Sequence, residues 1–158
     1  MLRISKLSDY AIIVLGHMAR DPDRVFAAND LASQAKIAPP TVSKVLKALV
    51  KAKIVHSTRG AKGGYQLTRA PSATPIASII AALEGPIALT ECGLGSTRCE
   101  QSGSCDVRGN WSVLNGAIQT ALESVTLEDM AVPMKKAPER FRIVIRNLAQ
   151  PASGCISE

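Results

Sequence analysis

Aromatic side chains and long apolar runs are both scarce in this sequence. Phe, Tyr and Trp make up only 3% of the 158 residues, whereas hydrophobic residues make up 46%, so a core must consist of Ala, Val, Ile and Leu. This composition favours a helical domain over a β-sandwich, whose sheets use aromatic and β-branched pairs. No segment approaches the roughly 20 consecutive apolar residues of a membrane-spanning helix. The first residues also lack a signal-peptide pattern, so we expect a one-domain, cytoplasmic chain without a membrane partner.

Acidic residues are scarce in the first half of the chain. Residues 1–69 hold twelve Lys or Arg against four Asp or Glu, residues 70–134 hold two against seven, and residues 135–158 hold five against two. A basic N-terminal half is typical of a surface that binds a polyanion, and an ordinary solvated basic surface is the alternative. Charge alone therefore leaves two interpretations open: a surface that binds nucleic acid, and an ordinary solvated basic surface.

The clearest periodic segment is a helix predicted at residues 41–52, opened by Pro39 and Pro40. Apolar residues recur at helical spacing on one face: Val42, Val45, Leu46 and Leu49. Basic residues share the opposite face: Lys44, Lys47 and Lys51. A short helix predicted at residues 30–35, with Asn29 as its cap, precedes it across a three-residue break. Two helices joined by a short turn are typical of a helix-turn-helix, and here the second helix carries basic residues on its outer face.

A β-hairpin is predicted directly after this helix. Residues 54–58 and 65–68 are β-branched or alternating segments, and residues 59–64 between them form a glycine-rich turn. A hairpin in this place is the wing of a winged helix. The expected fold is therefore mainly α with a small β-hairpin wing, a winged helix-turn-helix DNA-binding domain over residues 1–70.

Further helices are predicted on both sides of this unit. A helix at residues 8–19, capped by Ser8 or Asp9, is apolar nearly all round and is expected to be buried or to lie at an interface. Residues 71–106 are expected to form a linker helix, at residues 76–83, and a cysteine-bearing loop.

A long helix predicted at residues 107–124 carries one narrow apolar stripe. The stripe consists of Trp111, Leu114, Ile118, Leu122 and Val125. Such a stripe after a complete small domain favours a partner helix, and a two-fold homodimer suits paired DNA half-sites; packing on its own domain is the alternative. We expect residues 107–133 to form a C-terminal dimerisation helix and a final turn capped by Thr126, and residues 134–158 to form a disordered tail.

The helix-turn-helix predicts which side chains meet DNA, because an α-helix fits the major groove. Side chains of the first turns are placed to read base edges, and later lysines to contact phosphates. An arginine at the wing tip is favoured electrostatically in a minor groove. The predicted interface consists of Thr41, Ser43, Lys44, Lys47, Lys51, Arg59 and Lys62. A surface-exposed lysine stripe on an ordinary helix is the alternative, and the wing and the double proline argue against it.

Three of the four cysteines fall within fourteen residues: Cys92, Cys99 and Cys105. Cysteines of a cytosolic chain do not indicate structural disulfides, and thiolates in a glycine-rich loop can wrap a soft metal centre. The spacing differs from the CxxC pairs of zinc ribbons, and three thiolates are one short of the usual four. Spacing alone thus leaves an iron–sulfur cluster, a zinc site and unligated buried cysteines open.

Together these motifs resemble the winged-helix iron–sulfur transcriptional regulators typified by IscR and NsrR, and the branch that looks closest is the regulator of the SUF iron–sulfur assembly operon. The resemblance covers roughly residues 1–133 and rests on the three cysteines and on LRISKLSDY (2–10), PTVSKVLKAL (40–49), RGAKGGY (59–65), EGPIALTEC (84–92) and TLEDM (126–130). It implies a dimer that binds DNA, and a cluster ligated by Cys92, Cys99 and Cys105. We favour 2Fe–2S over 4Fe–4S.

Members of this family differ in the fourth cluster ligand. Those like IscR use a histidine three residues beyond the last cysteine, where this chain has Arg108, and a guanidinium offers no lone pair. Those like NsrR use an aspartate in the first helix of the other subunit, which Asp9 matches. We expect Asp9 to complete the site across the dimer; a plain helix-capping carboxylate is the alternative. Ser43 stands where IscR-like members often carry an acidic residue, so a different operator preference is expected.

The function implied by this resemblance is a cluster-sensing DNA-binding repressor of iron–sulfur cluster assembly (SUF) genes. Alternatives of the same fold are a nitric-oxide or redox-responsive repressor and a zinc-holding or cluster-free repressor. A small electron-transfer protein is the rival from another class, and the basic helix and wing argue against it. The sequence has no nucleophile–base pair, phosphate-binding loop or acid pair that would indicate an enzyme.

Overall fold

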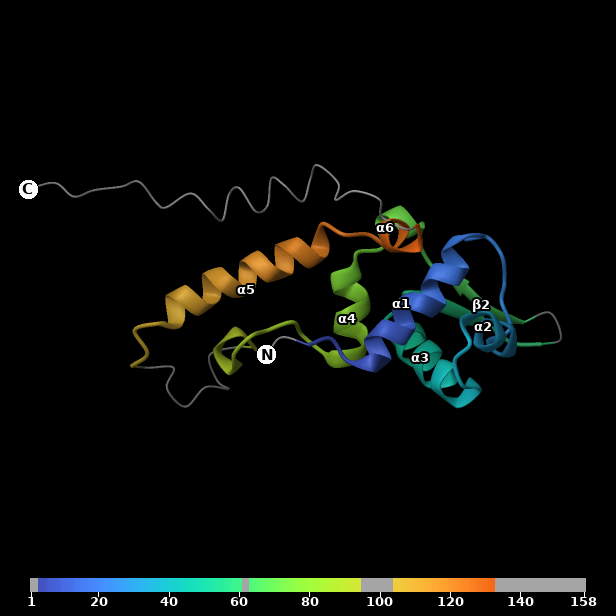
Figure 1. Cartoon of the computed structure of the whole chain (residues 1–158), viewed down its shortest axis with the longest axis horizontal. Coiled ribbons are helices and arrows are strands. Elements are labelled where there is room, and N and C mark those ends of the chain that lie inside the picture. Colours follow the sequence, from blue (N-terminus) through green and yellow to red (C-terminus); the bar gives the residue numbers. More distant parts are fainter. Residues whose placement is uncertain (1–2, 61–62, 95–103, 133–158) are drawn as a thin grey trace, which may run out of the picture.

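The helix α1 is the element around which the other helices of the domain gather (Figure 1). The computed structural model describes residues 3–60, 63–94 and 104–132. α1 spans Lys6–Ala19, and its apolar residues Val14, Leu15 and Met18 are fully buried. Four helices contact it: α2 (Ala28–Ala35), α3 (Pro39–Lys51), α4 (Ile76–Glu84) and α6 (Leu127–Ala131).

The amphipathic pattern predicted for α3 is confirmed. Its four apolar residues are all 0% exposed, and they face α1, α2 and α4: Val42, Val45, Leu46 and Leu49. α3 begins at Pro39 rather than at residue 41, because proline fits the first turn of a helix, where no backbone donor is needed. Between α2 and α3, Lys36 adopts a left-handed conformation with φ of 55° and ends α2.

The caps predicted for α1 and α2 were wrong. α1 is capped by Ser5, whose Oγ accepts a hydrogen bond from the Ser8 N–H at 3.3 Å. Ser8 is itself fully buried, and Asp9 lies one residue further into the first turn. α2 begins two residues before its predicted start, with Ala27 at the cap position and no side-chain cap bond, so Asn29 lies inside the helix.

The predicted hairpin is present. β1 (Val55–Thr58) and β2 (Gly64–Leu67) pair antiparallel, with Val55 opposite Leu67, and both of these side chains are buried. Phe26 and Tyr65 exchange two backbone hydrogen bonds of 2.8 Å, which tie the hairpin to the segment before α2. A mainly helical domain with a two-stranded wing is therefore the fold of this chain, as expected.

The helix α5 (Arg108–Glu123) extends away from the other α-helices, and its N-terminal end lies farthest from them (Figure 1). Two 3-10 turns accompany the linker: η1 (Pro71–Ala73) and η2 (Glu91–Leu94). The C-terminal end of α5 is tied to the start of α4 by a bridge, since the Ile76 N–H donates to Val125 and the Leu127 N–H donates to Thr74. We call this pair of hydrogen bonds the root clasp.

The apolar stripe of α5 is exposed at its outer end. Trp111 is 36% and Leu114 is 48% exposed, whereas Leu122 and Val125 pack on the domain core. The alternative in which the whole stripe packs on its own domain is therefore wrong for the outer half. α6 follows, and Thr126 caps it as predicted; the cap is a capping box, in which the side chains of Thr126 and Asp129 bond each other's backbone N–H groups. The predicted tail, residues 134–158, lies outside the described residues.

Candidate DNA-binding surface and cysteine loop

The candidate DNA-binding surface consists of the outer face of α3 and the tip of the hairpin. The lysines predicted for phosphate contact, Lys47 and Lys51, are exposed, as is Lys44. Thr41 and Ser43, predicted to read bases, are half-buried. Arg59, at the end of β1, is exposed, and Lys62 lies outside the described residues.

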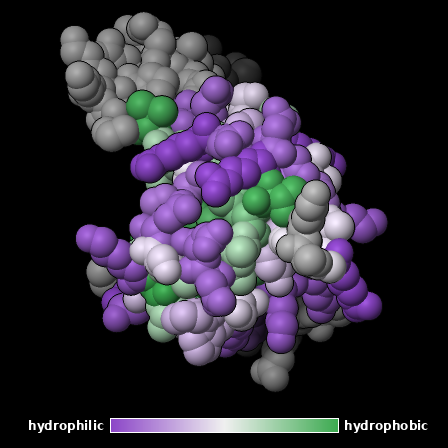
Figure 2. Space-filling model, turned by 90° about the vertical axis from the view of Figure 1, so that its right-hand side faces the viewer, coloured by the Kyte–Doolittle hydropathy of each residue, from purple (hydrophilic) through white to green (hydrophobic). Residues whose placement is uncertain are grey.

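The packing of α3 fixes this surface relative to the wing. α3 contacts β1, and its apolar face packs into the core, so the lysines of α3 and strand β1 belong to one packed unit. Figure 2 looks onto the end of the molecule that carries the hairpin and shows mostly hydrophilic side chains around a smaller apolar patch. A polar face with several exposed cations is the electrostatic footprint of a nucleic-acid-binding surface.

We refer to residues 86–106 as the cysteine loop, with a first arm at residues 86–94 and a second arm at residues 104–106. The first arm begins after Gly85, whose φ of 89° a side chain would strain. It is fastened to α5, because the Leu89 N–H donates to Oδ1 of Asn115 at 2.8 Å. The turn η2, which includes Cys92, follows and contacts α5.

The second arm leads into the first turn of α5. Cys105 is a half-buried free thiol, and the N–H of Arg108 donates to the Cys105 carbonyl at 3.3 Å. Arg108 and Asn115 are seven residues apart, so the two arms meet one helix within about two turns, or about 10 Å along its axis. The two described arms of the cysteine loop thus both meet α5, the first through Asn115 and the second where it enters the helix. Cys99 and the side chain of Cys92 lie outside the described residues.

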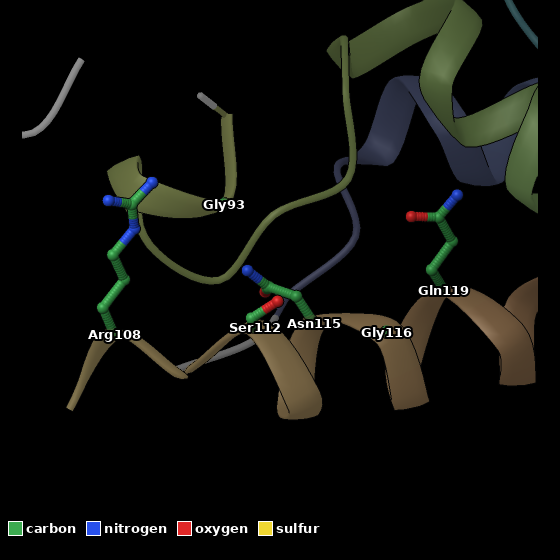
Figure 3. A pocket seen from close by; sticks show the side chains of 6 residues that line it. All are labelled: Gly93, Arg108, Ser112, Asn115, Gly116 and Gln119. Carbon is green, nitrogen blue, oxygen red and sulfur yellow. The ribbon is translucent and has the colours of Figure 1, made fainter. Parts of the chain in front are cut away.

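An open pocket of about 320 Å³ lies between α5 and the first arm. Figure 3 shows side chains of α5 that point toward the segment carrying Gly93. The pocket is lined by Gly93, Arg108, Ser112, Asn115, Gly116 and Gln119. Nδ2 of Asn115 is buried there and has no hydrogen-bond partner among the residues that the structure describes. The guanidinium of Arg108 and several N–H donors thus lie near η2, the turn that includes Cys92. These groups suit an anionic, sulfur-rich group.

The residues present therefore fit an iron–sulfur cluster in the chemistry of their donors. The part of the chain that the structure describes contains no group of three His, Cys, Asp or Glu side chains that could hold a metal ion. Asp9 is exposed in the first turn of α1, and Ser5 rather than Asp9 caps that helix, so the capping alternative for Asp9 is wrong.

Glu84 links α1 to the start of the cysteine loop. Its Oε1 accepts hydrogen bonds from the Ser5 N–H at 3.0 Å and from the Ser8 hydroxyl at 2.5 Å. These bonds, from Ser8 first and then from the Ser5 backbone, lower the pKa of the Glu84 carboxyl. Glu84 is the last residue of α4, so the N-terminus of α1 is fixed directly beside the point where the loop leaves the domain.

We expect Glu84→Gln to lower the urea midpoint at neutral pH and to matter less in acid. A carboxyl whose pKa is lowered by folding stabilises the fold fully above its ordinary value of 4.5, and this stabilisation is lost as the pH falls through the folded pKa. Urea unfolding of parent and variant at neutral pH and below 4.5 measures this. Glu128→Gln, an exposed carboxylate on α6, is the control. A midpoint difference that is equal at both pH values would refute the role of the charge.

The fold and its exposed basic helix define a winged-helix DNA-binding protein. The model of the Rrf2 family, described as iron-dependent transcriptional regulators, matches residues 4–133. The chain belongs to this family.

Curated relatives agree with this assignment. A protein of Aquifex aeolicus, named as a helix-turn-helix-type transcriptional regulator, is 29% identical over 123 residues, which cover 77% of this chain and 85% of that protein. One of Mycobacterium tuberculosis is 30% identical over 133 residues, with 82% and 81% covered. These relatives are transcriptional regulators and not enzymes.

Solved structures show the same fold. The global cysteine regulator CymR of B. subtilis has a TM-score of 0.65 and 30% identity, with 83% of this chain and 97% of that chain covered. IscR of T. potens has a TM-score of 0.62 and 25% identity, with 89% and 96% covered. Among the helices of the described part of the chain, none combines the length and the hydrophobicity needed to cross a bilayer.

Sequence reasoning missed Glu84 and Asn115, and it assigned Ser8 a capping role instead of the hydrogen bond to Glu84. Their roles depend on hydrogen bonds across 76 and 26 residues of chain. Nothing local marks these long-range contacts, although Glu84 and Gly85 lie within a segment that carried the family resemblance.

Proposed function

We propose that this chain is a cytoplasmic homodimeric repressor that binds an operator in double-stranded DNA and responds to an iron–sulfur cluster. The DNA-binding residues are Thr41, Ser43, Lys44, Lys47, Lys51, Arg59 and Lys62. The cluster ligands are Cys92, Cys99 and Cys105 of one protomer and Asp9 of the other. The genes controlled are those of iron–sulfur cluster assembly, and the cluster is 2Fe–2S.

The observation that carries the cluster proposal is the closure of the cysteine loop on α5. Both arms, one reaching Cys92 and the other Cys105, are fastened to the same helix by Asn115 and Arg108. The loop between them is then short enough to bring its thiolates around one centre. The description of the family as iron-dependent regulators supports the same assignment.

The residues of the chain would link this centre to DNA through α1. When bound, the cluster supplies a centre that responds to iron supply and oxidation. Cys92 and Cys105 would hold it beside the first turns of α5, and Asp9 would reach it from α1 of the partner protomer. α1 contacts α3 and is bonded to Glu84, so a displacement of α1 is transmitted to the DNA-reading helix.

Anaerobic purification followed by DNA binding tests this function. The parent is expected to be coloured, to contain stoichiometric iron and sulfide, and to bind its own upstream DNA with affinities that differ about 5- to 150-fold between holo and apo forms at one salt concentration. The triple variant Cys92→Ala, Cys99→Ala, Cys105→Ala is expected to lose both the cluster and this difference. A triple variant that binds DNA and responds to iron starvation as the parent does would refute the function.

The fourth cysteine and a second aspartate provide matched controls. Cys155→Ala removes a thiol outside the loop and should leave iron content unchanged. Asp9→Ala should release iron faster than the parent, whereas Asp30→Ala, in the first turn of α2, should not. Unchanged spectra and cluster lifetime in Asp9→Ala would remove Asp9 from the ligand set.

The same preparation separates the alternatives. A colourless protein that contains zinc supports the zinc-holding repressor, and a DNA-binding protein without metal supports a cluster-free one. A cluster whose loss is driven by nitric oxide or oxidants rather than by iron supply indicates the nitric-oxide or redox-responsive repressor.

A further inference from the structure

The outer face of α1 is left open by the part of the chain that the structure describes. The buried residues of α1 face the domain, whereas Asp9 is exposed and Ile13 is 38% exposed. Gly16 follows one turn after Ile13, and a Cβ built there would meet no atom within 4 Å. These three residues are spaced by four and then three positions, so they share one face of the helix over about two turns.

Gly16 is not required by the packing of its own chain. Its φ is not positive, so an alanine could adopt the same backbone conformation, and there is room for a side chain. Glycine inside a helix is less stable than alanine, because it loses more backbone freedom on folding. A glycine beside an exposed isoleucine leaves a surface on which another helix can pack closely.

The outer end of α5 is the second exposed apolar surface. Val107, at the cap position, is 50% exposed, and Trp111 and Leu114 are exposed as well. These residues are spaced by four and then three positions, which is the spacing found on α1. Within its own chain, this end of α5 extends away from α1 (Figure 1). A second copy of the chain can bring the two surfaces together.

We propose that the outer end of α5 of one protomer docks on the outer face of α1 of the other, an inference that rests on the homodimer of the proposed function. With the equal spacings in register, Trp111 covers Ile13. Leu114 lies over Gly16, where a large side chain meets the smallest one. The two-fold axis repeats the contact, so each protomer contributes one α5 and receives the other.

This register agrees with the charges and with the position of the cysteine loop. It places Val107 beside Asp9 of the partner protomer, and Cys105 is two residues before Val107. Asp9 then lies next to the partner's cysteine loop, as the proposed function requires. Lys6 is exposed one turn before Asp9 and comes beside Asp106, which is exposed as well. Opposite charges at the end of an apolar contact favour one register over its alternatives.

Photo-crosslinking tests the docking in a chain that keeps its cysteines. The variant Ile13→p-benzoylphenylalanine is irradiated, and the adducts are mapped by mass spectrometry. We expect covalent dimers in which position 13 is joined to residues 107–114 of the second copy. Adducts between the two α1 helices, or a dimer that forms no covalent adduct with α5, would overturn the docking.

A double-mutant cycle tests the contact of Leu114 with Gly16. Gly16→Leu fits the open space of the monomer but collides with Leu114 of the partner, so the dissociation constant of the dimer is expected to rise at least about tenfold. Adding Leu114→Ala makes room for the new leucine. The double variant should therefore dissociate about fivefold less than the product of the two single effects predicts. Strictly multiplicative effects would overturn this contact.

The matched control is Ser33→Leu, which adds the same side chain to an exposed position on α2. It should leave the dissociation constant unchanged, and Gly16→Leu with a parent-like constant would overturn the docking. If the parent is monomeric in light scattering, the homodimer and the docking fail together, whereas iron content and DNA binding are decided by their own assays. A parent that is dimeric but gives no adduct with α5 overturns the docking alone.

Discussion

The Leu114→Glu variant is expected to be monomeric at concentrations at which the parent is dimeric. Leu114 is 48% exposed on the outer half of α5, next to Trp111, and an exposed apolar stripe of this kind marks an interface. In the proposed homodimer, the two-fold axis brings Leu114 of both protomers into the interface. Burial of a leucine contributes about 1.5–3 kcal/mol, so removing two raises the dissociation constant by at least about 100-fold.

Size-exclusion chromatography with light scattering measures the mass of parent and variant. Thr120→Glu is the matched control, because it adds the same charge to an exposed position on the opposite side of the same helix. DNA affinity should fall together with the mass, since a monomer loses the gain from binding two half-sites. A Leu114→Glu protein that remains a dimer at the same concentration would exclude the outer stripe of α5 as the interface.

Replacement of both Lys47 and Lys51 by alanine is expected to weaken binding to all DNA sequences and to flatten its salt dependence. These lysines are exposed on α3, and the proposed function assigns them to phosphate contacts. Each phosphate contact contributes about 0.9 to the slope of log affinity against log salt. The proposed dimer would lose four such contacts, so its slope should be smaller by about 3 to 4.

Titrations of operator and unrelated duplexes at several salt concentrations measure these slopes. Lys6→Ala, an exposed lysine on α1, is the control. Both duplexes should weaken by the same factor in the Lys47, Lys51 variant, because phosphates carry no sequence information. A change confined to the operator would show that these lysines read bases, and an unchanged slope would remove them from the interface.

Periodicity predicted the winged helix well because its signals are local. The four apolar positions of α3 recur at helical spacing, and all four are fully buried. The glycine-rich turn predicted the hairpin because few residues allow its backbone conformation. The caps were less predictable: Ser8 has a good cap side chain, yet its hydroxyl bonds Glu84 across 76 residues, and that long-range contact overrides the local preference.

For the candidate site, the sequence offered residue types that stay a prediction, and it offered no sign of the contacts that hold the first arm of the loop on α5. Clustered cysteines indicated a metal-binding loop without any knowledge of tertiary structure. Asn115 could not be recognised, because an asparagine on a polar helix face has no sequence pattern that marks it as the acceptor for Leu89. The contact arises only when the loop folds back on α5.

The root clasp fixes the domain end of α5, so a tilt at that end moves the other end of the helix further. Because Ile76 and Leu127 bond Val125 and Thr74, the helix is pinned at its domain end while its sixteen residues reach outward. A helix of this length spans about 24 Å, so a tilt of about 5° at the pinned end moves the far end by about 2 Å. In the proposed dimer, a movement of about 2 Å at the end where the cysteines lie would thus go with a tilt of about 5° at the pinned end, and such a tilt would change the separation of the two DNA-reading helices.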